Sequence, residues 1–343
     1  MDDSDVVFHK DRGLGHITLN RPKALNALTL GMCAAMLRQL REWADDADVH
    51  AVVIDSHHER AFCAGGDVRW LVESAKMRDG GAAQFFATEY RLNATIKRYP
   101  KPYIALIDGF SFGGGMGISV HGSHRVVSKN ALGGMPETLI GLFPDIGANH
   151  FLNRCPGELG MYLALTSARL KAADLLYAGL ATHFVPVARF REIVPRLVDG
   201  EMPDAVLNSI EGDAGPAPLA GYRAAIDRAF AASSVDTILD ALKGEGDWGA
   251  TLAADLGKLS PTSLKVTFRA MREGKALDFA SCMRMDYRVA TRLAEHHDFA
   301  EGVRAAVIDK DQKPRWDPSR LDEVCDPDIA RYFEPLGGGE LTL

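Results

Sequence analysis

Two glycine clusters are the first candidates for chemistry in this sequence of 343 residues. Gly65-Gly66 follows a predicted strand at residues 51–55, and Gly113-Gly114-Gly115 follows another at 103–108. Each cluster also precedes a predicted helix, so each can expose backbone N–H groups at a helix start. Two such N–H groups form an oxyanion hole, which stabilises charge developing on a carbonyl oxygen. The clusters together therefore indicate acyl-group chemistry, although either cluster alone also fits a tight turn.

Two carboxylates form a second candidate group. Glu137 and Asp145 are eight residues apart, with Gly141 and Pro144 between them, so the chain can turn back and bring both to one cavity. Their neighbours are apolar, and desolvation or a second nearby carboxylate raises the pKa of such a group, which suits acid/base or nucleophilic catalysis. Spacing alone favours the alternative of two structural residues at helix ends, with Glu137 in a first turn after Pro136.

A serine nucleophile is a separate hypothesis. The segment 109–113 matches the G-x-S-x-G motif of α/β-hydrolases, with Ser111 at its centre between a predicted strand and a predicted helix. Histidines that could complete a triad follow later, among them His183. The pairs His57-His58 and His296-His297 are adjacent, unlike the i, i+4 pair of a zincin, and the five cysteines have no CxxC spacing, so we expect no metal site.

Composition excludes several other classes. Hydrophobic residues make up 47% and charged residues 25% of the chain, which is typical of globular proteins. The net charge of −7 without a basic stripe argues against nucleic acid as a partner, and no apolar run reaches the roughly 18 residues of a membrane span. The acidic start, residues 1–5, resembles no targeting signal, and the odd, scattered cysteines fit a reducing compartment. We therefore expect a cytoplasmic protein.

Alternating strands and helices must position these residues. Short β-type runs at 6–9 and 16–19 predict a hairpin, and helical spacing from Thr29 precedes the buried strand 51–55. A helix between two strands predicts a parallel pair, whose carboxyl end favours ligand sites. Asp67 can cap a helix that starts at Val68. Beyond about residue 190 the chain becomes helix-leaning, and the pattern as a whole predicts an α/β fold.

Several motifs resemble the enoyl-CoA hydratase/isomerase (crotonase) superfamily, namely residues 17–28, Ala61–Asp67 and Gly109–Gly117. More narrowly, the chain is similar to the thioester-hydrolase branch of that superfamily, and the similarity extends to the C-terminal part. The segments that carry it are 99–103, 113–122, 135–138, 141–147, 179–185, 260–265, 298–304 and 309–316. The resemblance implies a crotonase-like fold of repeated ββα units with a helical C-terminal region. Residues 1–190 would form a CoA-thioester-binding core, and 191–343 a helical extension that completes the same catalytic unit.

The resemblance also implies roles for individual residues. The thioester oxygen would lie between the N–H groups of Gly66 and Gly114, while Glu137 and Asp145 face the acyl group. Glu89 matches a substrate-contact position. Backbone atoms near Ala24 and Ala64 would hold adenine. Basic residues that flank the first two motif loops are candidates for the CoA phosphates, namely Arg21, Lys23 and Arg60.

The implied reaction is hydrolysis of 3-hydroxyisobutyryl-CoA, or of a close β-hydroxyacyl-CoA, to free acid and CoA in valine catabolism. CoA is part of the substrate, so no separate cofactor is expected, and either a monomer or a homo-oligomer fits. Three alternatives remain: an enoyl-CoA hydratase or isomerase, a Ser111 esterase and a non-catalytic CoA-binding scaffold. Hydration is disfavoured because Gly117 stands where hydratases carry a glutamate. Ala148-Asn149 stand where the hydrolase branch tends to carry Gly-Gly, a departure that affects pocket shape and acyl preference.

Overall fold

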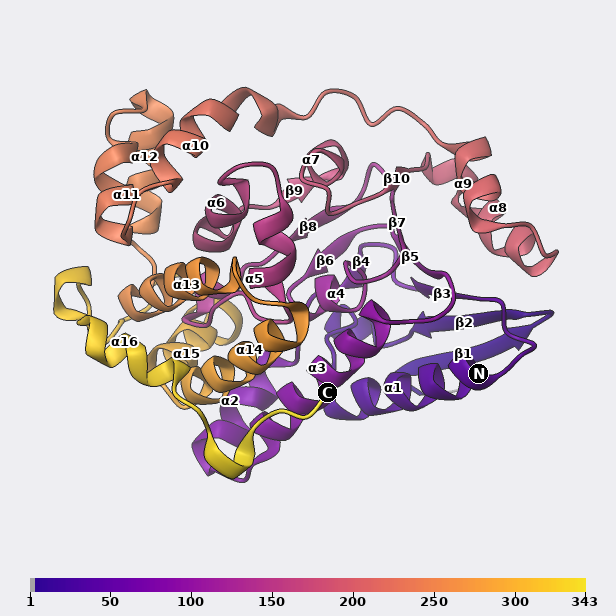
Figure 1. Cartoon of the computed structure of the whole chain (residues 1–343), viewed down its shortest axis with the longest axis horizontal. Coiled ribbons are helices and arrows are strands. Elements are labelled where there is room, and N and C mark those ends of the chain that lie inside the picture. Colours follow the sequence, from indigo (N-terminus) through magenta and orange to yellow (C-terminus); the bar gives the residue numbers. More distant parts are fainter. Residues whose placement is uncertain (1–3) are drawn as a thin grey trace. The chain divides into compact units, whose positions relative to one another are not determined.

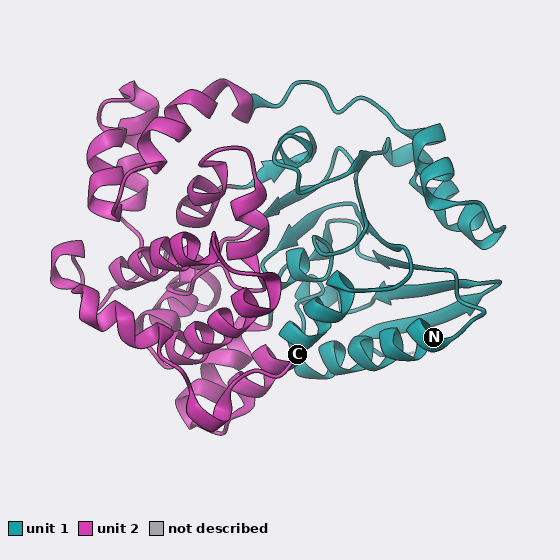
Figure 2. Ribbon diagram, in the orientation of Figure 1, with its two compact units in different colours: residues 1–66, 88–134, 169–218 teal, residues 67–87, 135–168, 219–343 magenta. Residues whose placement is uncertain are grey.

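The computed structural model describes residues 4–343. Residues 1–3, which belong to the acidic start discussed above, lie outside the described residues. The chain forms two compact units, each built from three segments (Figure 2). Unit 1 comprises residues 1–66, 88–134 and 169–218, and unit 2 comprises residues 67–87, 135–168 and 219–343. All strands of the described chain lie in unit 1, which confirms the α/β class, and unit 2 is helical.

A six-stranded sheet in the order β1-β2-β3-β5-β7-β10 is the framework of unit 1 (Figure 1). Its strands are β1 (Val6–Asp11), β2 (Leu14–Leu19), β3 (Ala51–Ser56), β5 (Tyr103–Ile107), β7 (His124–Val127) and β10 (His183–Phe184). β1 and β2 form the predicted antiparallel hairpin, and the remaining neighbours pair in parallel. The central strands β3 and β5 are buried almost throughout, as expected where both faces of a sheet are covered.

Helix α1 (Leu30–Asp45) makes the predicted crossover between β2 and β3. The Thr29 hydroxyl caps it by accepting a hydrogen bond from Met32 N at 3.1 Å. The apolar residues at helical spacing, Met36 and Leu40 among them, are fully buried, and the helix runs along the β1–β2 hairpin in Figure 1. An amphipathic helix between two adjacent strands brings the second strand in parallel to the first, as the sequence pattern predicted.

A second, smaller sheet brings the two glycine clusters together. Its order is β4-β6-β8-β9, with β4 (Ala61–Cys63), β6 (Phe110–Phe112), β8 (Leu132–Gly134) and β9 (Leu170–Lys171). β4 and β6 pair in parallel, Ala61 opposite Phe110 and Cys63 opposite Ser111. Parallel neighbours end at the same edge of a sheet, so the residues that follow β4 and β6 are adjacent in space.

The other helices of unit 1 complete its core. They are η1 (Pro22–Ala24), most of α3 (Gly81–Lys97), α4 (Gly114–Gly117), α7 (Ala172–Tyr177), α8 (Val187–Val198) and α9 (Pro203–Ile210). Ile193 of α8 and Leu207 of α9 belong to one buried apolar cluster with the sheet residues Val53, Ile104 and Val126. Burial of these side chains, at roughly 25 cal/mol per Å² of apolar surface, holds α8 and α9 on the sheet.

Unit 2 is built from helices alone within the described residues. They are α2 (Val68–Met77), η2 (Glu137–Ile140), α5 (Ala148–Phe151), η3 (Leu152–Arg154), α6 (Leu159–Thr166), α10 (Arg223–Phe230), α11 (Val235–Leu242), α12 (Gly246–Leu256), α13 (Pro261–Gly274), α14 (Phe279–Ala294), α15 (His297–Val303), η5 (Arg304–Ile308), η6 (Leu321–Glu323), α16 (Asp326–Phe333) and η7 (Gly337–Gly339), with η4 (Pro218–Tyr222) at the boundary between the units. The predicted Asp67 cap at the start of α2 is confirmed, and Ser260 caps α13 with Pro261 at the first position of that helix. The predicted division into a core of residues 1–190 and an extension of residues 191–343 stays a prediction. In the described chain, all elements after β10 are helices.

All five cysteines are free thiols, and four of them are buried, whereas Cys325 is exposed. Burial raises the pKa of Cys63 and of Cys155 to about 12, so these thiols stay protonated near neutral pH. Among residues 4–343, no helix is both long enough and apolar enough to cross a membrane.

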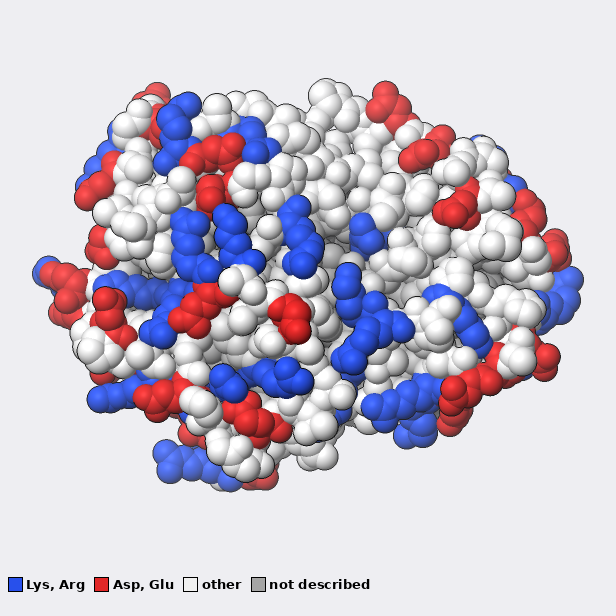
Figure 3. Space-filling model, viewed as in Figure 1, with Lys and Arg blue, Asp and Glu red and all other residues white. Residues whose placement is uncertain are grey.

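Charged side chains are mixed on the surface. Lysines and arginines share the face shown in Figure 3 with acidic residues, and many basic groups adjoin acidic ones. In unit 2, for example, Arg304 forms ion pairs with Glu301, Asp309 and Asp311 at 2.7–2.8 Å. The bond from Arg304 lowers the pKa of Glu301 to about 2, so this carboxyl group stays ionised over the physiological pH range.

Candidate active site

The amide groups of Gly66 and Gly114 are neighbours in unit 1. A Cβ atom built on Gly114 would lie 3.4 Å from Gly66 N, and one built on Gly65 would lie 3.9 Å from Gly114 N. Gly114 is the first residue of α4, where a helix leaves its N–H groups without an intrahelical partner. No backbone hydrogen bond found between described residues uses either amide. The two N–H donors are therefore available to a ligand oxygen, as an oxyanion hole requires.

The segment before α1 holds the first glycine loop in place. Leu28 N donates to Gly65 O at 2.8 Å, and Ala64 N donates to Leu25 O at 3.0 Å. The buried Asn26 side chain adds a bond from its Nδ2 to Phe62 O at 3.0 Å. These bonds rigidify the turn that carries Gly66, because each orients a main-chain group of the same loop.

Glu89 lies beside the second glycine loop. It projects from α3, is only 3% exposed, and its Oε1 lies under 3.0 Å from the position that a Cβ on Gly114 would occupy. No side chain larger than hydrogen fits between the α4 start and this carboxyl group. The structure thus brings Glu89, Gly66 and Gly114 together, while the substrate contact of Glu89 stays a prediction.

The predicted CoA-binding residues lie in two loops of unit 1, one before α1 and one around β4. Ala24 ends η1, and its carbonyl accepts a hydrogen bond from Ala27 N at 2.9 Å, while Ala64 is half-buried. Lys23 and Arg60 are exposed. Arg21 is half-buried and donates from Nη1 to Ala27 O at 3.0 Å, so it also stabilises the loop. Lys23 and Arg60 are therefore more accessible to a phosphate group in solution than Arg21 is.

Glu137 and Asp145 lie in one short segment of unit 2. Glu137 is the first residue of η2, directly after Pro136, and is 6% exposed, while Asp145 is 5% exposed. Leu142 N donates to Glu137 O at 3.0 Å, and Gly141 ends η2 in the left-handed conformation, so the chain reverses as its Gly and Pro residues predicted. Both carboxyl groups are buried, and the place of Glu137 in the first turn of η2 also fits the structural alternative, so their catalytic role stays a prediction.

Asp286 is a buried carboxyl group near Asp145 that sequence reasoning missed. It lies on α14, is fully buried, and accepts a hydrogen bond from Gly147 N at 2.7 Å. Burial and the charge of Asp145 raise the pKa of Asp286 well above its ordinary value. No local pattern marked this residue, because its partner is 139 positions away in the sequence.

Ser111 lacks the surroundings of a nucleophile. It lies in β6, is 1% exposed, and its hydroxyl has no hydrogen-bond partner among the described residues. A catalytic serine requires a base that takes its proton, and no histidine contacts this oxygen in the described part of the chain. The match to G-x-S-x-G therefore reflects the sequence around β6, and the structure shows no triad partner for Ser111 among the described residues.

We expect Ser111→Ala to keep the rate of acyl-CoA hydrolysis within about threefold of wild type, because the substitution removes no hydrogen bond and little volume. The initial rate of thiol release at saturating substrate measures this. A loss of several hundredfold would instead favour the serine esterase hypothesis.

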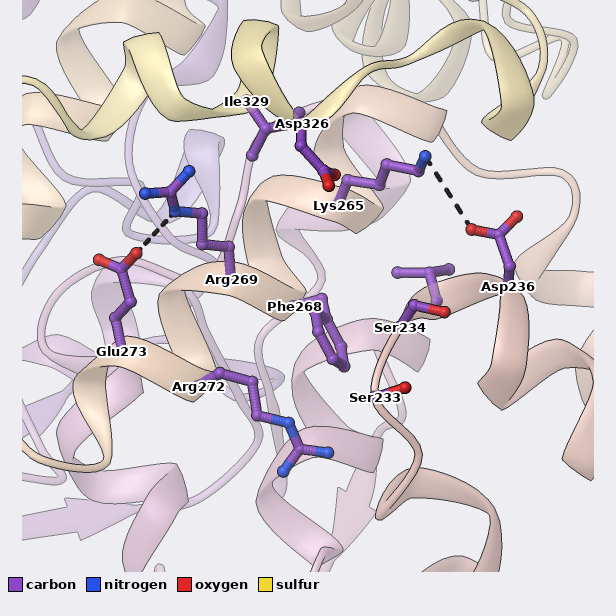
Figure 4. A pocket seen from close by; sticks show the side chains of 11 residues that line it. Ser233, Ser234, Asp236, Lys265, Phe268, Arg269, Arg272, Glu273, Asp326 and Ile329 are labelled. Atoms are coloured by element: carbon purple, nitrogen blue, oxygen red, sulfur yellow. Dashed lines mark hydrogen bonds and ion pairs between the residues drawn. The ribbon is translucent and has the colours of Figure 1, made fainter.

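A cavity of about 650 Å³ in unit 2 does not contain the candidate residues (Figure 4). It lies between α13, α16 and the start of α11, and its basic residues include Lys265 and Arg269. These pair with acidic neighbours, Lys265 with Asp236 at 3.9 Å and Arg269 with Glu273 at 2.6 Å, as the dashed lines in Figure 4 mark. Within residues 4–343, no group of His, Cys, Asp and Glu side chains is arranged to hold a metal ion.

The chain is similar to known proteins along nearly its whole length. The family model described as enoyl-CoA hydratase/isomerase matches residues 14–333. The mitochondrial 3-hydroxyisobutyryl-CoA hydrolase of Xenopus tropicalis is 44% identical over 99% of this chain and 91% of its own length. The human protein of the same name is 40% identical, again over 99% of this chain and 91% of its own length.

Solved structures share the fold. A carnitinyl-CoA dehydratase from Mycobacterium thermoresistibile superposes with a TM-score of 0.94 at 38% identity, covering 99% of both chains. An enoyl-CoA hydratase from Rhodobacter sphaeroides has a TM-score of 0.92 at 37% identity, covering 99% of this chain and all of its own. The fold expected from the sequence motifs is confirmed.

The expected cytoplasmic location is wrong. The vertebrate relatives that match 99% of the chain are mitochondrial proteins, which points to the mitochondrion. Reduced, scattered cysteines report only on redox conditions, so they could not distinguish the cytoplasm from another reducing compartment.

Proposed function

Because the chain belongs to the enoyl-CoA hydratase/isomerase family, we propose that it hydrolyses the thioester of 3-hydroxyisobutyryl-CoA, or of a close β-hydroxyacyl-CoA, to the free acid and CoA. The observation that carries this proposal is the adjacency of the Gly66 and Gly114 amides, with Glu89 beside them. The relatives named as hydrolases over 99% of the chain support the choice of reaction. The reaction would serve valine catabolism and would need no cofactor besides the CoA carried by the substrate.

The paired amides act on the carbonyl oxygen. Attack on a thioester carbon places negative charge on that oxygen, and each preorganised N–H donor lowers the barrier by about 3 kcal/mol. Both donors are main-chain groups in loops fixed by hydrogen bonds, so they require no rearrangement when the charge develops.

Glu137 provides the group that breaks the thioester. In one route its carboxylate attacks the carbonyl carbon, the C–S bond breaks to release CoA thiolate, and water then hydrolyses the resulting mixed anhydride. In the other route Glu137 takes a proton from water, which attacks the carbon directly. Asp145 orients the 3-hydroxyl group or assists water entry.

Hydration of a double bond is the second candidate, because the two solved structures above are named a dehydratase and a hydratase. Against it, Gly117 ends the buried helix α4 and supplies no carboxylate there. An assay with both substrates separates the two: we expect thiol release from 3-hydroxyisobutyryl-CoA and no loss of the crotonyl-CoA double bond. Loss of that double bond without thiol release would favour a hydratase, and neither reaction would indicate a CoA-binding scaffold.

Lys23 and Arg60 are proposed to contact the CoA phosphates, with Arg21 as a third candidate. We expect the double variant Lys23→Glu/Arg60→Glu to weaken CoA binding by about tenfold at low salt, because two attractive charges become repulsive near an anion. Titration calorimetry with free CoA at two salt concentrations measures this. Lys129→Glu, an exposed lysine in the same unit, is the matched control. Equal affinity of the double variant and wild type would remove this assignment.

A further inference from the structure

The backbone directly after Asp145 adopts an unusual conformation. Ile146 has a φ of +54° and Gly147 a φ of +79°, so two successive residues are left-handed. Glycine adopts this conformation freely, whereas a β-branched residue does so only where its surroundings enforce it. Ile146 is fully buried, and Ala148 N closes the turn by donating to Asp145 O at 2.8 Å. The direction of the Asp145 side chain therefore depends on whatever holds this turn.

Asp286 of α14 contacts this turn at two points. Its Oδ2 accepts from Gly147 N at 2.7 Å, and its Oδ1 accepts from Asn149 Nδ2 at 2.5 Å. The Asn149 backbone is anchored in turn, since Asn153 Nδ2 donates to Asn149 O at 2.5 Å. Both Asp286 oxygens are thus bonded to the segment that follows Asp145, and the side chain is completely shielded from solvent.

We propose that Asp286 is a positioning residue for Asp145, holding the left-handed turn at 146–147 through Gly147 N and the Asn149 side chain. The inference rests on the proposed function, in which Asp145 acts at the acyl group. Each oxygen of this buried carboxyl group accepts from an N–H donor of the segment after Asp145, and leaving either donor unpaired in the interior would cost free energy, so the two bonds tie the turn to α14. Small displacements of a catalytic group are costly, so the turn controls the reaction rate.

Asp286→Asn is the first test. The amide keeps the size of the side chain but replaces one acceptor by an NH₂ group, which opposes either Gly147 N–H or the Asn149 amide. We expect kcat for thiol release to fall by about 10- to 100-fold, with KM within about threefold of wild type. An unchanged kcat would overturn the proposal.

Two double variants separate positioning from general stability. If Asp286 acts through Asp145, Asp145→Asn/Asp286→Asn should be no slower than Asp145→Asn alone, whereas additive losses would overturn the proposal. In Asp286→Asn/Asn149→Asp the donors and acceptors are exchanged: the amide introduced at position 286 would accept from Gly147 N and donate to the carboxylate introduced at position 149. We expect this exchange to restore most of kcat. Failure to restore it in a folded protein would also count against the proposal.

Hydrogen exchange provides a readout that needs no activity. We expect faster exchange in the peptide covering residues 145–151 of Asp286→Asn, with protection restored in the exchanged pair. Arg284→Gln, at an exposed position of the same helix, should leave that peptide unchanged. If Asp286→Asn does not fold, Asn149→Ala removes only one of the two bonds and should speed exchange at the same peptide.

Thiol release tests the proposed function, and hydrogen exchange tests the positioning role of Asp286. A wild-type protein that releases no thiol would refute the proposed function, while the exchange data would still decide whether Asp286 holds the turn. Unchanged exchange in both Asp286→Asn and Asn149→Ala would refute the positioning role even if the enzyme is an active hydrolase.

Discussion

Glu137→Gln is expected to abolish thiol release from 3-hydroxyisobutyryl-CoA, lowering kcat by at least about a thousandfold. Glutamine has the shape of glutamate, but its amide neither attacks a carbonyl carbon nor accepts a proton from water near neutral pH. Glu137 is buried at the start of η2. Because glutamine fills the same space there, we expect substrate affinity to stay within about threefold of wild type. Stopped-flow thiol detection together with binding of a non-hydrolysable thioether analogue measures both quantities.

The route through Glu137 is determined by isotope labelling. A single turnover in ¹⁸O-labelled water should place label in the Glu137 carboxyl group if an anhydride forms and water attacks its glutamyl carbon. Label found only in the released acid would weaken the covalent route and favour activated water. Glu137→Gln with wild-type activity would remove Glu137 from the mechanism altogether.

Gly114→Ala should lower kcat by about 100- to 1000-fold, the effect of losing one oxyanion donor. The new methyl group would lie under 3.0 Å from Glu89 Oε1 and 3.4 Å from Gly66 N. Because the Glu89 carboxyl group is buried, either this side chain or the start of α4 must move. Movement of α4 turns the Gly114 N–H away from the carbonyl oxygen, and movement of Glu89 disturbs a substrate contact.

Gly221→Ala is the matched control, since its new methyl group meets no atom within 4 Å. We expect the control to keep wild-type kcat and both variants to keep cooperative thermal unfolding. An active Gly114→Ala enzyme would show that the adjacent amides do not hold the reacting oxygen.

Local chemistry made much of this fold predictable. The Thr29, Asp67 and Ser260 caps depend on side chains within three residues of the amides they bind, so the sequence pattern indicates them directly. The parallel pairing of β2 with β3 followed from the helix between them. The loops that carry Gly66 and Gly114 were likewise marked by glycines placed between strands and helices.

Features that depend on distant partners were not predictable. The strands of the second sheet have two or three residues each, too few for a recognisable alternation, so the residue pattern did not show the contact between the glycine loops, which only the family resemblance implied. Asp286 reads as one polar position in an amphipathic helix, and only the folded chain places it against Gly147. Many local sequence patterns together indicate the fold class. The contact between the glycine loops and the bond from Gly147 to Asp286 each depend on a single pair of residues that are far apart in the sequence.

The distribution of the cysteines offers a built-in probe of unfolding. With four thiols enclosed and Cys325 at the surface, a chromogenic disulfide reagent should titrate about one group per native molecule and five after denaturation. The colour from that single group sets a fixed background when the same reagent follows CoA release. Any rise above one equivalent in an enzyme preparation therefore reports the fraction of damaged molecules before a kinetic measurement begins.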